Sequence, residues 1–322
     1  MNYIHQKNSM VDCFGLIKTI DKKLNVKGVP YLDMTICDKD SEINAKLWDY
    51  KEELHGEYKV NDIIKFRGQL SQYNGVDQLR IDRLRHVTDQ DNVKIEDFVP
   101  SSEYSSEMML GQIYNILDTF RDNNLKTLTK AIIDDHKEEL LYWPAAFKLH
   151  HAMRGGLLYH TLSIIKMAQC ACNVYPNIDR ELLLSGAILH DIAKIQEYDV
   201  SQTGVATSYS IKGNLLGHLV MGAMEIHEKA KKLGIDEKTS VLLEHMLISH
   251  HGVPEYGVAV RPLFIEAEVL CQLDTLDATV FEMASSISAV EADAFTQRQW
   301  ALDNRKLYNH GRLDIKPKAN LE

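Results

Sequence analysis

The stretch "LSGAILHDIAKIQE", from Leu184 to Glu197, shows most directly how the C-terminal part of this chain folds. Its apolar residues recur every three or four positions, which is the pattern of a helix that buries one face. Two polar residues, His190 and Asp191, interrupt that pattern. An imidazole or a carboxylate is costly to bury unless hydrogen bonds or a cation compensate. The stretch therefore predicts a core helix whose polar residues are held by a partner other than water.

Helical periodicity continues through most of the chain after residue 107. It recurs in residues 108–120, 125–136, 155–174, 180–198, 216–234, 238–252 and 261–286. Apolar residues at this spacing form one stripe on each helix, and such stripes pack together in a bundle. The second part of the chain is therefore predicted to be an all-α bundle.

The first part of the chain has a different period. Five short, partly alternating segments rich in β-formers occupy residues 12–20, 29–38, 41–50, 61–70 and 76–87. The dipeptide Asn74-Gly75 between the last two is the one that a two-residue hairpin favours. Five strands of this length predict a small closed barrel of the OB type, a fold that commonly takes single-stranded nucleic acid.

We therefore expect a multidomain α and β protein. Its 322 residues are enough for about two domains. The expected division is an OB-like domain over residues 1–90, a linker over 91–107, a helical domain over 108–312 and a disordered tail over 313–322.

Composition narrows the function classes. No run approaches the roughly 18 apolar residues of a membrane span, and the N-terminus lacks an apolar leader, so we expect a cytoplasmic protein without a membrane partner. The five cysteines contain no CxxC pair and indicate neither disulfides nor a thiolate metal site. The net charge of −10 argues against coating nucleic acid by bulk charge, and residues 1–95 are neutral. The acidic remainder suits a cation site.

Histidines gather in the helical part, where nine of the fourteen lie between His150 and His251. Several stand inside apolar periodic segments, each on a different predicted helix. The candidates are His160, His190, Asp191, His218, His250, His251 and Asp274. Bundles bring ligands from separate helices to one core site, and imidazole with carboxylate favours ions such as Mn, Fe, Zn or Mg. Alone, the pair "HD" is more typical of a satisfied core histidine beside an N-cap or surface aspartate.

In this order the motifs resemble those of the HD-domain metal-dependent phosphohydrolases, from Pro144 to Asp277. The resemblance implies one metal held by His160, His190, Asp191 and Asp274, and a second held by His218, His250 and His251, with Asp191 bridging. Asp277 is the alternative to Asp274. Lys194, at the "HDxxK" position, would bind a phosphate oxygen or help to neutralise its charge, and the alternative is a surface lysine. His150, His151 and Arg154 are candidate phosphate contacts, and His227 and His245 are expected to be packing or surface residues.

Two cations would lower the pKa of a bridging water, orient the resulting hydroxide in line with a phosphodiester and stabilise charge on the attacking and leaving oxygens. In this role Asp191 and Lys194 would be the catalytic residues. The chain has neither a phosphate-binding glycine loop nor a Gly-x-Ser-x-Gly nucleophile elbow that would compete with this chemistry.

The barrel segments "AKLWD" and "IIKFRGQLSQYNGVDQLRI", followed by "LHHAMRGGLLYHT" and "LHDIAKI", resemble the YhaM-type 3′-to-5′ exoribonucleases of Gram-positive bacteria over almost the whole chain. This resemblance implies removal of nucleotides from the 3′ end of single-stranded RNA, with DNA left open, and release of nucleoside 5′-monophosphates. Two divalent ions are implied, manganese first, with Mg, Fe, Co or Zn as alternatives.

Nucleic-acid contacts are also expected on the barrel. Tyr31, Trp48 and Tyr73 could stack bases, and Lys46, Arg67 and Arg80 could contact phosphates, unless the aromatic residues form the barrel core. Two other functions stay open: a phosphohydrolase of small nucleotides, and a non-catalytic nucleic-acid-binding factor. A helical surface around "MGAMEIHEKAKK" leaves a homo-oligomer open as well.

Overall fold

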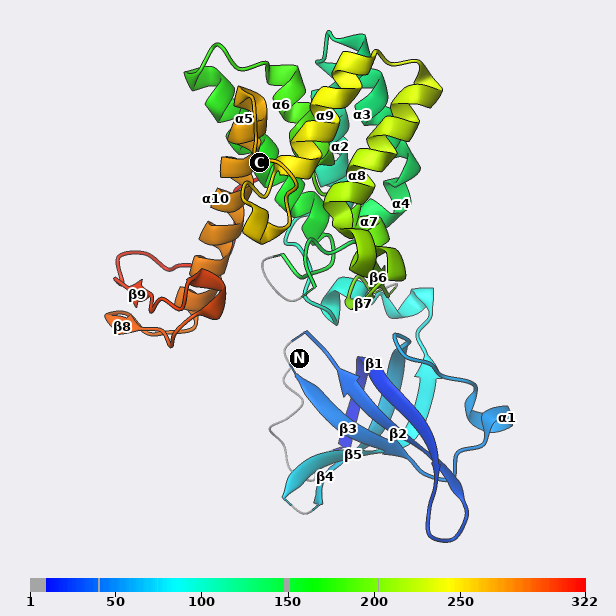
Figure 1. The fold of residues 1–322 in the computed structure, drawn as a ribbon. Coiled ribbons are helices and arrows are strands. Elements are labelled where there is room, and N and C mark those ends of the chain that lie inside the picture. The colour runs from blue at the N-terminus through cyan, green and yellow to red at the C-terminus, as the bar shows by residue number, and fades with distance from the viewer. Residues whose placement is uncertain (1–9, 40, 74, 148–150, 202) are drawn as a thin grey trace. The chain divides into compact units, whose positions relative to one another are not determined.

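The computed structural model describes residues 10–39, 41–73, 75–147, 151–201 and 203–322, with the backbone alone at position 73. The chain forms two compact units, Met1–Ser101 and Ser102–Glu322. The first contains the five strands of a barrel, and the second contains most of the helices (Figure 1). The predicted class, a β-barrel followed by a helical bundle, is confirmed.

The N-terminal unit is a closed five-stranded barrel with the strand order β1-β2-β3-β5-β4, in which β1 also pairs with β4. Its elements are β1 Met10–Leu24, β2 Pro30–Cys37, β3 Glu42–Leu47, α1 Glu52–His55, β4 Ile63–Tyr73 and β5 Val76–His86. The pair β3–β5 is parallel, and the other neighbours in the barrel are antiparallel. This closed arrangement of five strands is that of an OB-fold.

Alternation decides which side chains fill the barrel. On β2, Leu32, Met34 and Ile36 are buried, so the residues between them point outward. The predicted hairpin is present, since Tyr73 pairs with Val76 across a two-residue turn. Gly75 has a φ of 80°, as that turn demands, while Asn74 lies outside the described residues.

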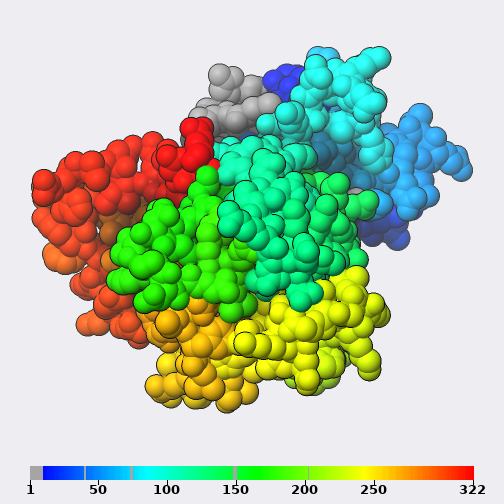
Figure 2. All heavy atoms as spheres, turned by 90° about the horizontal axis from the view of Figure 1, so that it is seen from above, coloured from blue at the N-terminus to red at the C-terminus, as the bar shows by residue number. Residues whose placement is uncertain are grey.

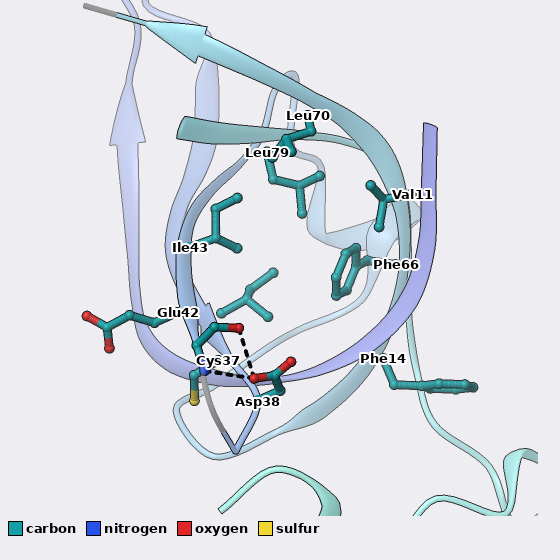
Figure 3. Close-up of a pocket in the computed structure, with 11 residues that line it drawn as sticks. Val11, Phe14, Cys37, Asp38, Glu42, Ile43, Phe66, Leu70 and Leu79 are labelled. Atoms are coloured by element: carbon teal, nitrogen blue, oxygen red, sulfur yellow. Dashed lines mark hydrogen bonds between the residues drawn. The ribbon is translucent and has the colours of Figure 1, made fainter. Parts of the chain in front are cut away.

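A small hollow lies at one end of the barrel. Apolar side chains from β1, β4 and β5 line it, among them Val11, Phe66 and Leu79 (Figure 3). At its rim, Asp38 accepts two hydrogen bonds of 2.9 Å from Ser41. None of the predicted metal ligands lines this hollow.

The second unit is a bundle of helices. They are α2 Ser106–Asp118, α3 Asn123–Asp135, α4 Lys137–Leu140, α5 Gly156–Val174, α6 Arg180–Leu189, α7 Lys194–Glu197, α8 Ile211–Leu233, α9 Glu237–Ser249 and α10 Ile265–Ser288. Several begin at a side-chain oxygen that accepts a hydrogen bond from a first-turn backbone N–H, as N-caps do. These caps are Ser105, Asp122, Asp179, Ser210 and Asp236. None of the helices in the described part of the chain has both the length and the apolar character that crossing a membrane requires.

Helices α5 and α6 form the centre of the bundle. Residues 156–165 of α5 and 182–189 of α6 are buried on every side. A helix that is apolar all round lies in the core, so these two helices carry their few polar residues into a dry interior. Helices α2, α3, α9 and α10 cover them.

Two sequence predictions for this unit need correction. The helix expected over residues 180–198 ends at Leu189, and α7 starts only at Lys194. The unit is also not made of helices alone, because it contains two short hairpins, one of β6 Tyr198–Val200 with β7 Ala206–Tyr209 and one of β8 Ala294–Phe295 with β9 Tyr308–Asn309. Pairs of strands this short show no alternation that a sequence pattern could register.

The expected tail is not disordered. Leu321 is fully buried in the main core, and its carbonyl accepts a hydrogen bond of 3.1 Å from Gln112. The backbone N–H of Ala319 donates to the Tyr159 hydroxyl on α5. Figure 2 shows the C-terminal residues, in red, against the green segment that contains α5. Only partners distant in sequence order this segment, so composition alone did not reveal it.

The expected linker is also partly ordered. Phe98 and Val99 are buried against Leu16 of β1, and Val93 and Ile95 pack beside them. The first part of residues 91–107 therefore belongs to the N-terminal unit, whose boundary falls at Ser101.

Candidate metal centre

Seven side chains from five segments meet in the core of the helical unit, and we call them the metal centre. His160 lies on α5, His190 caps the end of α6, and Asp191 follows it directly. His218 lies on α8, Asp274 on α10, and His250 and His251 follow the end of α9. The structure thus brings together all the residues that the sequence singled out as ligands.

One group of ligand atoms surrounds Oδ2 of Asp191. This oxygen lies 3.3 Å from Nε2 of His190 and 3.6 Å from Nε2 of His160. The same His160 nitrogen lies 3.1 Å from Oδ1 of Asp274. A single ion could therefore contact these four residues.

A second group surrounds the other oxygen of Asp191. Oδ1 lies 3.3 Å from Nε2 of His218 and 3.7 Å from Nε2 of His250. Ligand atoms of His218, His250 and His251 all lie within 4.8 Å of one another. Asp191 therefore faces one histidine group with each oxygen, which is the geometry required of a carboxylate that bridges two ions.

All five histidines of the centre are oriented in the same way. In each, Nδ1 contacts an oxygen: His160 with Asp277 at 2.7 Å, His190 with Ala187 at 2.9 Å, His218 with Glu197 at 3.0 Å, His250 with Leu247 at 2.8 Å and His251 with Tyr256 at 3.2 Å. A carbonyl or carboxylate oxygen accepts, so Nδ1 carries the proton. In the neutral ring this leaves the Nε2 lone pair free for a metal.

The buried atoms that face the centre test whether a metal fits. Both oxygens of Asp191 and Nε2 of His218 and His250 are buried and have no hydrogen-bond partner among the described residues. Lys194 lies 2.7 Å from Oδ2 of Asp191, but as an ion pair without hydrogen-bond geometry. Unsatisfied buried polar atoms are rare and call for an explanation. Two divalent cations would complete this set of imidazole and carboxylate donors.

The electrostatics of the centre point the same way. Burial lowers the pKa of His160, but hydrogen bonds and charge from Asp274 and Asp277 outweigh it and raise the pKa to about 10. Burial also lowers the pKa of His250, to about 3, which keeps this ring neutral and able to bind a metal. Asp274 and Asp277 therefore stabilise positive charge beside His160. The neutral ring of His250 provides a lone pair that can bind a cation.

Asp274 and Asp277 have different roles. Asp277 binds the Nδ1 side of His160, away from the centre, and also lies 2.8 Å from Nε2 of His151 and accepts from Ser163. Asp274 lies on the Nε2 side of the same ring. His151, His160 and Asp277 are close enough together to resemble a metal site of their own. Their contacts instead form a network that orients His160, and this favours Asp274 as the ligand.

The phosphate contact expected at His151 needs correction. Only 1% of this residue is exposed, and its ring packs 4.0 Å from the ring of Phe281. Its backbone φ of 56° lies in the left-handed region, which residues other than glycine seldom adopt. His151 therefore supports Asp277 and does not present an edge to substrate. Arg154 is half-buried over the Tyr142 ring, and His150 lies outside the described residues.

Sequence reasoning missed Glu197. This residue is buried, and its Oε1 accepts hydrogen bonds from the backbone N–H of His218 at 3.1 Å and from Nδ1 of the same ring at 3.0 Å. Burial raises the pKa of Glu197, but the bonds from His218 outweigh it and lower that pKa. Gly217 has non-helical angles (φ 69°, ψ 161°), so α8 is interrupted immediately before His218. The one available signal was a carboxylate at the end of the apolar "HDIAKIQE" run.

Two histidines outside the centre behave as expected. His227 is exposed and lies 3.1 Å from Glu244. His245 accepts a hydrogen bond of 3.0 Å from the backbone N–H of Leu263. Neither has a contact with the metal centre among the described interactions.

Three of the predicted nucleic-acid residues form a group on the outer barrel surface, which we call the barrel platform. The rings of Tyr31 and Trp48 stack with centroids 4.5 Å apart, and Nζ of Lys46 lies 5.6 Å from each. Arg80 is opposite Lys46 in the β3–β5 register. The platform residues are therefore not barrel core, which Leu32, Ala45 and Leu47 fill instead. Arg67 is exposed on β4, and the side chain of Tyr73 lies outside the described residues.

Comparison with known proteins agrees with this fold and this centre. The HD domain family model matches residues 157–279, which include every residue of the metal centre. The helical unit therefore contains an HD domain. Together with the relatives described next, this domain makes the chain an enzyme that depends on divalent metal.

Two curated relatives identify the family more closely. A protein named 3′-5′ exoribonuclease YhaM from Bacillus licheniformis is 34% identical over 305 residues, which cover 95% of this chain and 96% of that protein. The protein of the same name from Bacillus subtilis strain 168 is 35% identical over the same shares. The chain belongs to this YhaM family.

Solved structures also match part of this chain. A single-stranded DNA-binding protein from Thermus aquaticus is 15% identical, with a TM-score of 0.23, and the match covers 27% of this chain and 44% of that one. The OB-fold assignment itself rests on the strand order described above.

Proposed function

We propose that this protein is a metal-dependent 3′-5′ exoribonuclease that hydrolyses the phosphodiester bonds of single-stranded RNA and releases nucleoside 5′-monophosphates. The observation that carries the proposal is Asp191, whose two buried oxygens face two separate histidine groups. Relatives named 3′-5′ exoribonuclease over 95% of the chain support the polarity and the substrate.

Two divalent cations, manganese by preference, would activate water and neutralise charge on the attacking and leaving oxygens. One cation would be held by His160, His190 and Asp274. The other would be held by His218, His250 and His251, and Asp191 would bind both cations. Glu197 and Asp277 fix the rings of His218 and His160. Lys194, buried beside Asp191, adds a positive charge that would attract a phosphate oxygen.

We assign hydrolysis to the helical unit (Ser102–Glu322) and strand binding to the N-terminal unit (Met1–Ser101). The barrel platform offers ring faces beside an ammonium, which is the combination that holds single strands without reading their sequence. Stacking and phosphate contacts do not require a 2′-hydroxyl, so the proposal includes single-stranded DNA as a second substrate. Because such RNA is found in the cytoplasm, we place the enzyme there.

The test is an incubation of metal-free protein with 5′-labelled single-stranded RNA, with and without Mn²⁺, beside the variant Asp191→Asn. Asparagine keeps the size of the side chain but removes its charge. We expect a ladder that shortens from the 3′ end with Mn²⁺ only and is absent in the variant. RNA that stays intact while the wild-type protein binds Mn²⁺ would refute the exonuclease.

A further inference from the structure

The segment that follows α10 has two unlike faces. Residues 294–318, which we call the aromatic arm, contain β8, a short 3-10 helix (Trp300–Leu302) and β9. Strands β8 and β9 lie beyond the end of α10 (Figure 1). Leu302 and Leu307 are buried in a small core against Ile287 of α10. The aromatic residues point the other way: Phe295 is 62% exposed, Trp300 73% and Tyr308 44%.

The Tyr308 hydroxyl donates a hydrogen bond of 2.9 Å to Asp293, but the rings of Phe295 and Trp300 are not needed for the fold of the arm. Its inner side is already filled by leucines, and its strands are joined through backbone bonds, such as that of 2.9 Å from Thr296 N–H to the Leu307 carbonyl. Phe295 and Tyr308 stand opposite each other in the β8–β9 register with ring centroids 5.0 Å apart. Single exposed apolar residues are normal, but a group of three aromatic residues on one short segment marks an interaction surface.

The charge of the arm identifies the kind of partner. In a chain with a net charge of −10, the arm carries six basic residues against two aspartates. The basic residues are Arg298, Arg305, Lys306, Arg312, Lys316 and Lys318. Among the described ion pairs, Lys306 and Arg312 have none. A cationic surface with exposed rings fits an anionic polymer that carries flat bases, and its own charge opposes contact with the same face of a second copy.

We propose that the aromatic arm is a second binding site for single-stranded RNA, where Trp300 and the Phe295–Tyr308 pair stack bases and Lys306 and Arg312 contact phosphates. This inference rests on the proposed function, since it assumes an RNA substrate. It adds a site within the HD-domain unit itself, separate from the barrel platform.

The position of the arm sets a length requirement. Helix α10 carries Asp274 of the metal centre and ends at Ser288. At 1.5 Å per residue, the arm begins roughly 20 Å along the helix from that ligand. A stacked strand rises about 3.4 Å per nucleotide, so about six nucleotides would separate the cleaved end from the arm. Shorter RNA would reach the metal centre without touching the arm.

The experiment measures the binding of a fluorescein-labelled 20-nucleotide RNA by anisotropy, with the full chain in EDTA so that nothing is cleaved. We expect Trp300→Ala to weaken binding at least about fivefold and Trp300→Phe, which keeps a stacking ring, to weaken it less. Lys306→Gln should lower the slope of log affinity against log salt by about one. The matched control is Tyr175→Ala, because Tyr175 is as exposed (63%) but lies at the end of α5.

A trinucleotide in Mn²⁺ separates the two proposals. Wild type and Trp300→Ala should cleave it at equal rates, since it is too short to reach the arm, and equal rates also show that the variant is folded. If the wild-type protein cleaves neither the trinucleotide nor the 20-nucleotide RNA in Mn²⁺, the proposal that it is an exonuclease is wrong. Unchanged affinity of Trp300→Ala for the 20-nucleotide RNA, beside an active wild type, overturns the arm alone. An assembly that Trp300→Ala dissociates at unchanged RNA affinity would instead show that the arm joins copies of the chain.

Discussion

The metal centre and the barrel platform both use aromatic and charged side chains, but they hold them in opposite ways. In the centre, every histidine has Nδ1 fixed by an oxygen, and five of the seven residues are buried. On the platform, Trp48 is 39% exposed and is held by one stacked ring and one nearby ammonium. When a buried polar group loses its partner, no water replaces the lost hydrogen bond. An exposed group in the same situation can hydrogen-bond to water. Substitutions should therefore act steeply in the centre and gradually on the platform.

The largest effect should come from the bridging carboxylate. Asp191→Asn removes the charge that both ion sites share, so we expect the bound Mn²⁺ to fall below two per chain and turnover to fall at least about a thousandfold. Elemental analysis and RNA cleavage measure the two quantities. His227→Ala serves as the control, because that histidine is exposed and its described ion pair is with Glu244, outside the centre. An Asp191→Asn protein with two ions per chain would contradict the bridging role.

Substitution of a residue that hydrogen-bonds to a metal ligand should have the next largest effect on metal binding. Glu197→Gln keeps an oxygen near His218 but weakens the hold on its Nδ1, so we expect Mn²⁺ affinity to fall about 10- to 100-fold. Titration calorimetry on metal-free protein measures this affinity directly. Glu244→Gln, which changes the partner of exposed His227, should leave it unaltered. If Glu197→Gln and Glu244→Gln changed the Mn²⁺ affinity equally, the buried partner of His218 would not be important for metal binding.

The platform should respond more weakly. Trp48→Ala removes one stacking face, which is worth about 1–3 kcal/mol per base, so RNA affinity should fall about tenfold. Cleavage of a trinucleotide should stay unchanged, because the metal centre is intact. Fluorescence anisotropy measures the RNA affinity, and a turnover assay measures the cleavage of the trinucleotide. If Trp48→Ala abolished turnover of the trinucleotide, the contrast between the two regions would be wrong.

The smallest effect should come from an ion pair of intermediate burial. Burial opposes the charge on His136, but Glu225, 2.6 Å away, outweighs it and raises the pKa of His136. The stability from this pair is therefore fully present below the unfolded-state pKa of about 6.5 and is lost as pH rises through the folded-state pKa. Denaturation of His136→Gln should show a loss of about 1 kcal/mol at pH 5.5 that shrinks at pH 9. A loss that grows with pH would reverse the assigned sign.

The ligands of the metal centre could be predicted from the sequence because each is a polar residue inside an apolar helical pattern. His160 and His190 stand out for this reason, and so do the barrel strands, whose alternation is local. Glu197 could not be identified in the same way, since its role depends on His218, which lies 21 residues further along. The break at Gly217 that positions His218 is likewise visible only in the backbone angles.

What the sequence by itself determined is the class of fold, the residue types of the centre and their order along the chain, because periodicity and motif spacing are local properties. Only the tertiary structure decided which oxygen of Asp191 faces which histidine group, that Asp277 orients His160 while Asp274 faces the centre, and that Leu321 closes the core. It also showed that Trp300 points into solvent. The physical reason is that these outcomes depend on contacts between residues far apart in the chain, and no local pattern encodes the direction of a side chain at such a contact.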